Sequence, residues 1–270
     1  MSFACIRHIC LAGLMTGASA ASALDTPQEF AVFARPEPPR IARTLTPPQR
    51  FVEISRTGAD WGPLVPDSDD LALLDAARRA DWEQVAVLVK AGANPNVTDE
   101  LRRARVLPLA AAAGEVEIVR QLLAAGASVD VRGEHGLTPL GAATVRGHMH
   151  VVRLLLREGA DIERPNANGN TPLMEAAVLD RLELAELFLA AGADPLRFNR
   201  SGHHALTLAA ASGSVKVTQH LLRLGIDPET PDRVRQSPLY WAMHEGQDAT
   251  VTLLLAAGAQ YANMSPTMRR

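Results

Sequence analysis

The sequence predicts an all-α solenoid of about six helix-turn-helix repeats, and three observations lead to this prediction. Glycine recurs at positions 92, 126, 159, 192, 225 and 258, so that the successive intervals are 34, 33, 33, 33 and 33. Each interval contains two short apolar segments. Hydrophobic residues make up 47% of the 270 residues but aromatic residues only 4%, which fits a core of stacked Leu, Val and Ala layers. Such a fixed period is typical of solenoids, in which each unit packs on its neighbours.

The segment from Leu137 to Asp161 shows how one unit should fold. Thr138 and Pro139 should start the first helix, because the hydroxyl can accept a free backbone N–H and proline needs no donor in the first turn. Gly147 should allow a turn with positive φ. The second helix then presents a wide apolar face that consists of Val151, Val152, Leu154, Leu155 and Leu156. Gly159 should end this helix in the left-handed conformation.

The other units, taken in chain order, differ from this one at a few positions. The pair from Leu71 to Val89 is more polar outside and should cap the N-terminal end, since the end layer of a solenoid faces water. The starts of the first helices in the later units are Arg105-Val106, Thr138-Pro139, Thr171-Pro172, His204-Ala205 and Ser237-Pro238. In the fourth unit Asp180 replaces the glycine between helices, and Leu187 should lie in a central core layer. The last helix, from about Ala249 to Ala257, should point Thr250 and Thr252 outward as a weak cap.

A period of 33 with Thr-Pro-Leu ahead of an alanine pair resembles the ankyrin repeat. The resemblance extends roughly from Asp69 to Ala262 and implies six repeats separated by β-hairpin fingers. It also implies a concave surface, formed by the finger tips and the exposed side of the first helices, that binds other proteins. By register the tips are Thr98 to Arg105, Arg132 to His135, Arg164 to Asn168, Arg197 to Ser201 and Thr230 to Arg235.

Positive charge concentrates in these tips. They hold nine arginines and four acidic residues, a net charge of +5 in a chain whose formal net charge is −3. Arginine and aromatic anchors are typical of interface hot spots, and arginine pairs well with carboxylates. We therefore expect a partner protein with an acidic surface to contact Arg132, Arg164, Arg197, Phe198, Arg200, Arg233, Met174 and Tyr240. Trp241 should lie in the core, because its register position is usually packed inside.

The N-terminal segment suggests export, and the composition outside the repeats divides the rest of the chain into an arm and a tail. Residues 1–23 resemble a cleaved signal peptide, with Arg7, an apolar run from Ile9 to Ala18, and small residues after it. Both cysteines, Cys5 and Cys10, would leave with it, which suits an oxidising compartment such as a bacterial periplasm. Residues 24–68 form a proline-rich arm or linker, residues 69–262 the repeat domain, and residues 263–270 a C-terminal tail. The arm could be a spacer, pack along the solenoid, or be held for a partner.

Catalytic signatures are missing from the sequence. It contains no Gly-x-Ser-x-Gly, no phosphate-binding glycine loop, no His-Glu-x-x-His and no Cys-x-x-Cys. His148 should be structural, and His204 stands where a capping threonine is expected. His203 and His204 have no third histidine or carboxylate near them in sequence, so a metal site is not expected. The segment Asn166–Asn170 contains Asn-Gly and should be a turn.

These observations favour a non-catalytic periplasmic module that binds one protein, without cofactor or metal, as a monomer. The mild net charge gives no reason to expect nucleic-acid binding. Two alternatives remain open. The arginines of the fingers could bind an anionic envelope component such as a phosphorylated glycolipid at the membrane surface. Less favoured is an enzyme with an unrecognised histidine site, which would need His203, His204 or His244 to converge with carboxylates in space.

Overall fold

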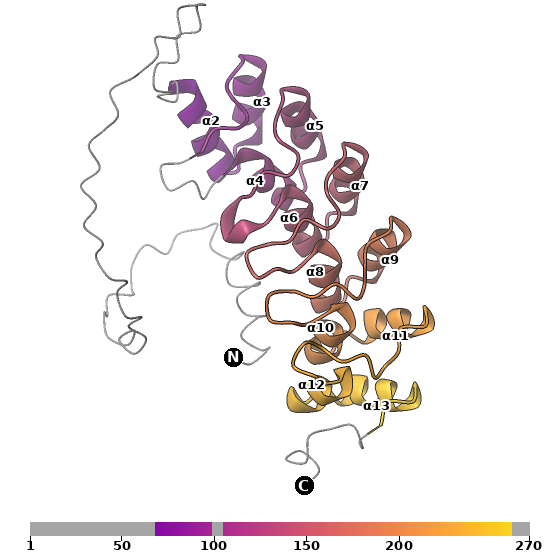
Figure 1. Cartoon of the computed structure of the whole chain (residues 1–270). Coiled ribbons are helices and arrows are strands. Elements are labelled where there is room, and N and C mark those ends of the chain that lie inside the picture. The colour runs from indigo at the N-terminus through magenta and orange to yellow at the C-terminus, as the bar shows by residue number, and fades with distance from the viewer. Residues whose placement is uncertain (1–67, 99–104, 261–270) are drawn as a thin grey trace, which may run out of the picture. The chain divides into compact units, whose positions relative to one another are not determined.

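A computed structural model describes residues 68–98 and 105–260, which form twelve α-helices in six consecutive pairs and contain no strand (Figure 1). The first helices of the pairs are α2 (Ser68–Arg78), α4 (Val106–Ala113), α6 (Pro139–Arg146), α8 (Pro172–Val178), α10 (Ala205–Ser212) and α12 (Pro238–His244). The second helices are α3 (Trp82–Lys90), α5 (Val116–Ala124), α7 (Met149–Arg157), α9 (Leu182–Ala190), α11 (Val215–Arg223) and α13 (Asp248–Ala256). A 3₁₀ turn, η1, covers Glu134–Gly136. The all-helical class is therefore confirmed for these residues.

Several sequence predictions fall outside the residues that the structure describes. They are the signal peptide at residues 1–23, the proline-rich arm except for Ser68, residues 99–104 of the first predicted finger tip, the last two residues of the predicted repeat domain, and the C-terminal tail. Within residues 68–98 and 105–260, no helix is long and apolar enough to cross a membrane.

The pairs stack in register, so that the first helices form one row and the second helices another (Figure 1). Each first helix contacts the next first helix along the chain, from α2 to α12. Each first helix also contacts the second helix of its own pair. A single pair of such short helices exposes much of its apolar surface, and this stacking buries it.

Side chains cap the first helices of the third to sixth pairs, as the sequence predicts, whereas Arg105 at the start of α4 makes no such hydrogen bond. The Thr138 hydroxyl accepts a hydrogen bond from the Gly141 backbone N–H at 3.1 Å, and the Thr171 hydroxyl accepts one from Met174 at 3.3 Å. In the fifth pair, Nδ1 of His204 takes over this task and accepts from the Thr207 backbone N–H at 3.3 Å. The histidine thus replaces threonine as a helix cap.

The turns between helices also follow the prediction. Gly147 has φ 82° and Gly159 has φ 83°, both in the left-handed region. Asp180, which stands in place of a glycine, has φ 52°. Its side chain then accepts a hydrogen bond from the backbone N–H of Val217 in the next pair, at 3.0 Å. Aspartate therefore supplies both the turn and a link between neighbouring pairs.

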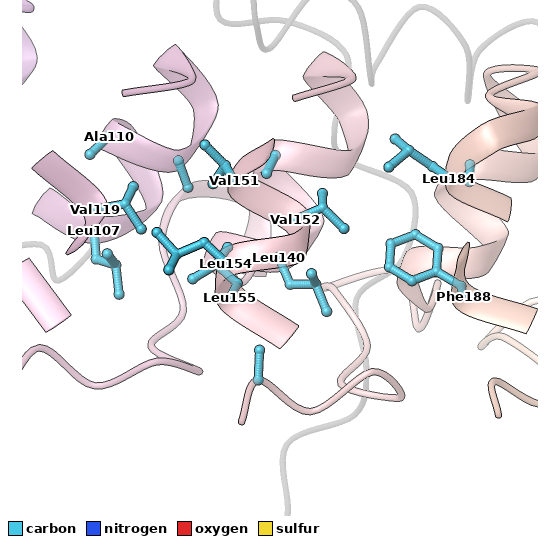
Figure 2. Packing of buried hydrophobic residues seen from close by; sticks show 14 of the residues in the cluster. Leu107, Ala110, Val119, Leu140, Val151, Val152, Leu154, Leu155, Leu184 and Phe188 are labelled. Carbon is cyan, nitrogen blue, oxygen red and sulfur yellow. The ribbon is translucent and has the colours of Figure 1, made fainter. Parts of the chain in front are cut away.

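The core consists of apolar side chains that recur once in every repeat. Leu155 on α7 and Phe188 on α9 occupy equivalent positions, and both are fully buried (Figure 2). Val151, Val152 and Leu154 join Leu155 in the same cluster, whereas Leu156 is half-buried at its edge. The wide apolar face predicted for α7 is thus mostly confirmed.

Two sequence-based assignments of burial are wrong. From the sequence, Leu187 is expected in a central core layer, but it is half-buried, whereas Phe188, one repeat after Leu155, is fully buried. Thr250 is also expected to face solvent, but it is fully buried, and its hydroxyl finds no hydrogen-bond partner among the described residues. Thr250 occupies the position of Val151 and Val217, which are buried apolar residues. The register of stacking, not polarity, decides its burial.

The loops between successive pairs form fingers, which we define as residues 130–137, 163–170, 196–203 and 229–236. In all four, one backbone N–H donates to a carbonyl further along the same loop at 2.9 Å: Gly133 to Leu137, Asn166 to Asn170, Asn199 to His203 and Asp232 to Gln236. The described residues contain only an isolated antiparallel bridge between Thr98 and Arg105 and no strand. The β-hairpin geometry expected for the fingers is therefore not confirmed.

Adjacent fingers are joined backbone to backbone. The Ala167 N–H donates to the His135 carbonyl at 3.1 Å, and the Arg200 N–H donates to the Asn168 carbonyl at 3.1 Å. The close approach requires glycine, because a Cβ on Gly169 would lie 2.6 Å from the Arg200 backbone nitrogen. These links hold consecutive finger tips at a fixed spacing.

Core stability should depend on Leu155 far more than on Leu187. Leu155→Ala should leave a cavity in a central layer and lower the free energy of unfolding by about 2 to 5 kcal/mol. Leu187→Ala removes the same atoms from a half-buried site and should cost clearly less. Urea or thermal denaturation of the two purified variants measures the difference. Equal losses would show that the register of the core is misassigned.

The contact between fingers can be tested with two glycines of nearly equal φ. Gly169 (φ 82°) faces the Arg200 backbone, whereas Gly159 (φ 83°) has no atom within 4 Å of a new Cβ. Gly159→Ala should cost about 1 to 2 kcal/mol from left-handed strain alone. Gly169→Ala carries the same strain and also forces the two fingers apart, so that its loss should exceed that of Gly159→Ala by about 1 to 3 kcal/mol. Parallel thermal melts compare them, and matching losses would contradict a tight finger contact.

Candidate functional site

In each of the last three fingers, a buried Asn or Asp side chain accepts hydrogen bonds from the backbone of the same finger. Asn166, Asn199 and Asp232 lie one repeat apart from each other and are all buried. The Oδ1 of Asn166 accepts from the backbone N–H groups of Asn168 at 2.8 Å and Asn170 at 3.0 Å. Each finger tip therefore rests on a side chain that is itself fixed in the interior, which limits its motion.

Asp232 uses its carboxylate in the same way. Its Oδ1 accepts from the backbone N–H groups of Val234 at 2.9 Å and Gln236 at 2.8 Å. Its Oδ2 accepts from Nε1–H of Trp241 at 2.7 Å and from Nδ1 of His203 at 3.1 Å. Four donors thus surround the two oxygens, which compensates for burying a charged group.

The buried polar groups of neighbouring fingers are hydrogen-bonded to one another. Glu175 of α8 is 1% exposed, and its Oε1 accepts from Nδ2 of Asn166 at 2.6 Å and Nδ2 of Asn170 at 3.0 Å. Asn170 in turn accepts from Nδ2 of Asn199 at 2.8 Å. The Oδ1 of Asn199 accepts from the backbone N–H of His203 at 2.9 Å. A continuous network therefore runs from Glu175 through three fingers to Asp232 and Trp241.

Burial shifts the titration of both histidines in this region. Burial lowers the pKa of His203, while the neighbouring Asp232 carboxylate opposes that shift. Burial likewise lowers the pKa of His204, against a smaller opposing effect of the hydrogen bond to the Thr230 carbonyl. Nδ1 of His204 accepts the capping hydrogen bond while Nε2 lies 3.1 Å from that carbonyl, so the cap requires the neutral ring protonated on Nε2.

The outer ends of the fingers carry arginine. Five of the predicted contact arginines are exposed: Arg132, Arg164, Arg197, Arg200 and Arg233. Among residues 68–98 and 105–260, neither Arg132, Arg164 nor Arg200 makes an ion pair. Arg197 differs, because its Nη1 lies 3.0 Å from Oε2 of Glu163. Glu163 also accepts the Asp194 backbone N–H at 2.8 Å, so Arg197 is partly engaged in joining two pairs.

An aromatic and apolar group lies beside the arginines of the last two fingers. Phe198 is half-buried, with the Arg233 guanidinium carbon 5.2 Å from its ring centre, within the range of a cation–π contact. The Phe198 and His204 rings lie 5.9 Å apart. Leu196 is 46% exposed and Val234 is 57% exposed on the same two fingers. These fingers therefore offer a partner both positive charge and apolar surface.

Helix α12 contributes three aromatic rings that contact one another. Tyr240 is half-buried and stacks on the exposed His244 with ring centres 6.0 Å apart. Trp241 contacts the rings of Tyr240, His203 and His244 at 5.2, 4.9 and 5.7 Å. Trp241 packs against the core as predicted, although it is half-buried and also bonds Asp232. Tyr240 thus remains accessible on a rigid support.

Met174 does not belong to this surface. The sequence predicts that it lies beside the groove, but its side chain is 1% exposed and lies within the main hydrophobic cluster. The seven residues of α8 are all buried, so this first helix is covered more completely than the repeat pattern suggests. A partner could not reach Met174 without disrupting the core.

The other histidine predictions can be placed as well. Nε2 of His148 lies 3.0 Å from the Ala112 carbonyl of the preceding pair, as expected for a structural residue. His203 and Asp232 converge, and Nδ1 of His244 lies 3.0 Å from Oε1 of Glu245. The His203 and Asp232 side chains are only 8% and 0% exposed, which keeps a dissolved substrate away from that pair. No three His, Cys, Asp or Glu side chains within the described ranges are placed to hold a metal ion.

Sequence reasoning missed the polar network and the engagement of Arg197. A signal for the network was present, since Asn166, Asn199 and Asp232 recur with the same period as the glycines. Nothing in the local sequence marks Glu163 as a partner of Arg197 in the next repeat, or Glu175 as the acceptor for the buried amides of Asn166 and Asn170. The segment Asn166–Asn170 was correctly predicted as a turn, but its buried amides were not foreseen.

The stacked helix pairs and the linked fingers define a helical repeat solenoid. A family model for ankyrin repeats, in 3 copies, matches residues 73–166 and 107–199. Residues 73–199 therefore match ankyrin repeats. Over 79 residues it is 44% identical to the glycerophosphocholine phosphodiesterase gde1 of Schizosaccharomyces pombe (strain 972 / ATCC 24843). That stretch covers 29% of this chain and 7% of the yeast protein, so the chain spans only a small part of this relative's length.

The histidine cap should make the fold sensitive to acid. Since the pKa of His204 is lowered by burial from 6.5, the unfolded chain binds a proton below about pH 6.5 that the folded chain does not. Stability should therefore fall as the pH drops below that value. His204→Thr restores the cap residue of the neighbouring pairs and should reduce the loss between pH 8 and pH 5. Urea titrations at both pH values measure it, and an unchanged difference would contradict the assigned neutral cap.

Proposed function

We propose that this protein is a non-catalytic interaction module that binds an acidic surface of another protein through its finger face. We define this face by Arg132, Arg164, Arg200, Arg233, Phe198 and Tyr240. The single observation that carries the proposal is the run of exposed guanidinium groups on consecutive fingers, Arg132, Arg164, Arg200 and Arg233, none of which makes an ion pair among residues 68–98 and 105–260. Ankyrin repeats, which residues 73–199 match, generally mediate contacts between proteins.

The rigidity of the fingers, which fixes the positions of their arginines, supports this proposal. The tips are joined by backbone hydrogen bonds of 3.1 Å and rest on buried side chains, so that binding would order little further backbone. A preorganised surface loses less conformational entropy on binding than a flexible one. The arginine spacing follows from the stacking of the repeats and would select a partner whose carboxylates match it.

The C-terminal fingers are the favoured centre of the contact. Arg200 and Arg233 lie there beside Phe198 and the exposed Val234, and Tyr240 lies on the adjoining helix α12. Hot spots combine arginine and aromatic side chains at positions that can be fully desolvated. Arg132 and Arg164 extend the same charge toward the preceding fingers and would steer the partner rather than anchor it.

We further propose that the module acts in the periplasm after the segment 1–23 is removed. The support is the sequence pattern at that end, an apolar run from Ile9 to Ala18 followed by small residues. Removal of both cysteines with this segment suits an oxidising compartment. Fractionation of the native cells and mass measurement of the purified chain would reveal whether the segment is cleaved.

The finger face can be tested with a charge reversal. The protein, tagged at the C-terminus, is cross-linked in its native cells, and its stoichiometric partner is identified and purified. Arg164→Glu, Arg200→Glu and Arg233→Glu together should weaken binding of that partner by at least about a hundredfold, because each reversal turns attraction into repulsion. Calorimetry with the purified partner measures the change.

A matched control separates the finger face from net charge. Lys90, Lys216 and Arg223 are exposed on second helices, and reversing all three to Glu changes the net charge by the same amount. This control should leave affinity within a few-fold of the parent. If both triple variants lost binding equally, or if the finger variant kept it while melting like the parent, the proposed face would be wrong.

A further inference from the structure

A hollow on the row of second helices gathers three more arginines. It lies between α5 and α7, has a volume of about 240 Å³, and is lined by Val116, Arg120, His150, Arg153, Leu154 and Arg157. Leu154 is buried and Val116 half-buried, so that they form an apolar floor, whereas the arginines and His150 are exposed. This hollow is separate from the finger face and uses none of its residues.

Positive charge in this hollow is poorly compensated. Helix α7 contains no acidic residue, and Glu117 is the only one in α5. Glu117 approaches Arg120 at 3.5 Å, but both side chains are more than half exposed, so the pair is weak. Neither Arg153 nor Arg157 makes an ion pair within residues 68–98 and 105–260. These two like charges lie one turn apart on one helix face, an arrangement that destabilises an isolated helix.

The concentration of charge is local to this pair of helices. The positions of His150 and Arg153 are occupied one repeat later by Glu183 and Glu186 of α9. Glu186 lies 3.4 Å from His220 of α11, so its carboxylate contacts the following pair of helices. The repeat therefore does not impose a basic groove along the row, and the cluster at α5 and α7 is a feature of these two units.

We propose that this hollow is a binding site for a phosphate monoester group. Three guanidinium groups from two adjacent helices can pair with a dianion. A single carboxylate in the same place would leave most of the positive charge unpaired. Guanidinium groups suit phosphate because their N–H donors pair with two oxygens at once. The apolar floor of Val116 and Leu154 would receive the carbon atoms next to the phosphate. The phosphate could belong to a soluble metabolite or to a lipid headgroup.

The soluble source is tested by titrating the purified protein with inorganic phosphate and with glycerol 3-phosphate at constant ionic strength. Amide NMR signals of residues 116–124 and 149–157 should shift together. Arg153→Gln and Arg157→Gln should each weaken binding about tenfold, since each removes a charged hydrogen-bonding group. Arg223→Gln is the matched control, because Arg223 is exposed at the position of Arg157 two pairs later. It should bind like the parent.

The lipid source is tested by sedimentation with phosphatidylcholine vesicles that contain or lack phosphatidic acid. Binding only to vesicles with phosphatidic acid, lost in Arg153→Gln and Arg157→Gln but kept in Arg223→Gln, would assign the phosphate to a headgroup. Thermal melts confirm that all variants remain folded. Absence of binding to every probe would overturn the proposed site, and so would equal losses in the Arg153 and Arg223 variants.

Discussion

A pair of short helices cannot bury its own apolar side chains, so each pair in this chain depends on the pairs packed against it. Leu155 and Phe188 are fully buried because neighbouring layers, which repeat the same apolar pattern, cover them. The same constraint accounts for the short first helices, the capping side chains that start them, and the left-handed turns that end them. It also explains why Thr250 is buried despite its hydroxyl, since its place in the stack is an interior one.

Stacking also builds the fingers. Once the helices are in register, consecutive loops approach closely enough for Ala167 and Arg200 to bond the preceding finger, and only glycine fits at Gly169. The polar groups that this arrangement buries are satisfied by one another, from Glu175 to Asp232. A fully satisfied polar network in a low-dielectric interior is rigid, and this rigidity is what a surface of fixed arginines requires.

Arginine appears on two separate surfaces of the solenoid, with different surroundings. On the fingers Arg233 lies over the Phe198 ring and next to the exposed Val234, which favours a protein partner with apolar as well as acidic groups. Between α5 and α7 arginine surrounds a hollow that is small and nearly free of acidic residues, which favours a compact anion. Because the two sites share no side chain, occupation of one leaves the other physically accessible, and a single chain could hold a protein and an anion together.

The sequence by itself determined the all-helical repeat, the turns at Gly147 and Asp180, and the capping roles of Thr138 and His204, because these depend on residues within a few positions of each other. It also placed the arginines at the finger tips. Only the tertiary structure decided that Met174 is buried, that Phe198 lies under Arg233, and that Arg197 pairs with Glu163. The same holds for the hollow between α5 and α7. Each of these depends on side chains from different repeats, which meet only after two layers have packed, and their contacts depend on the exact rotation of each helix.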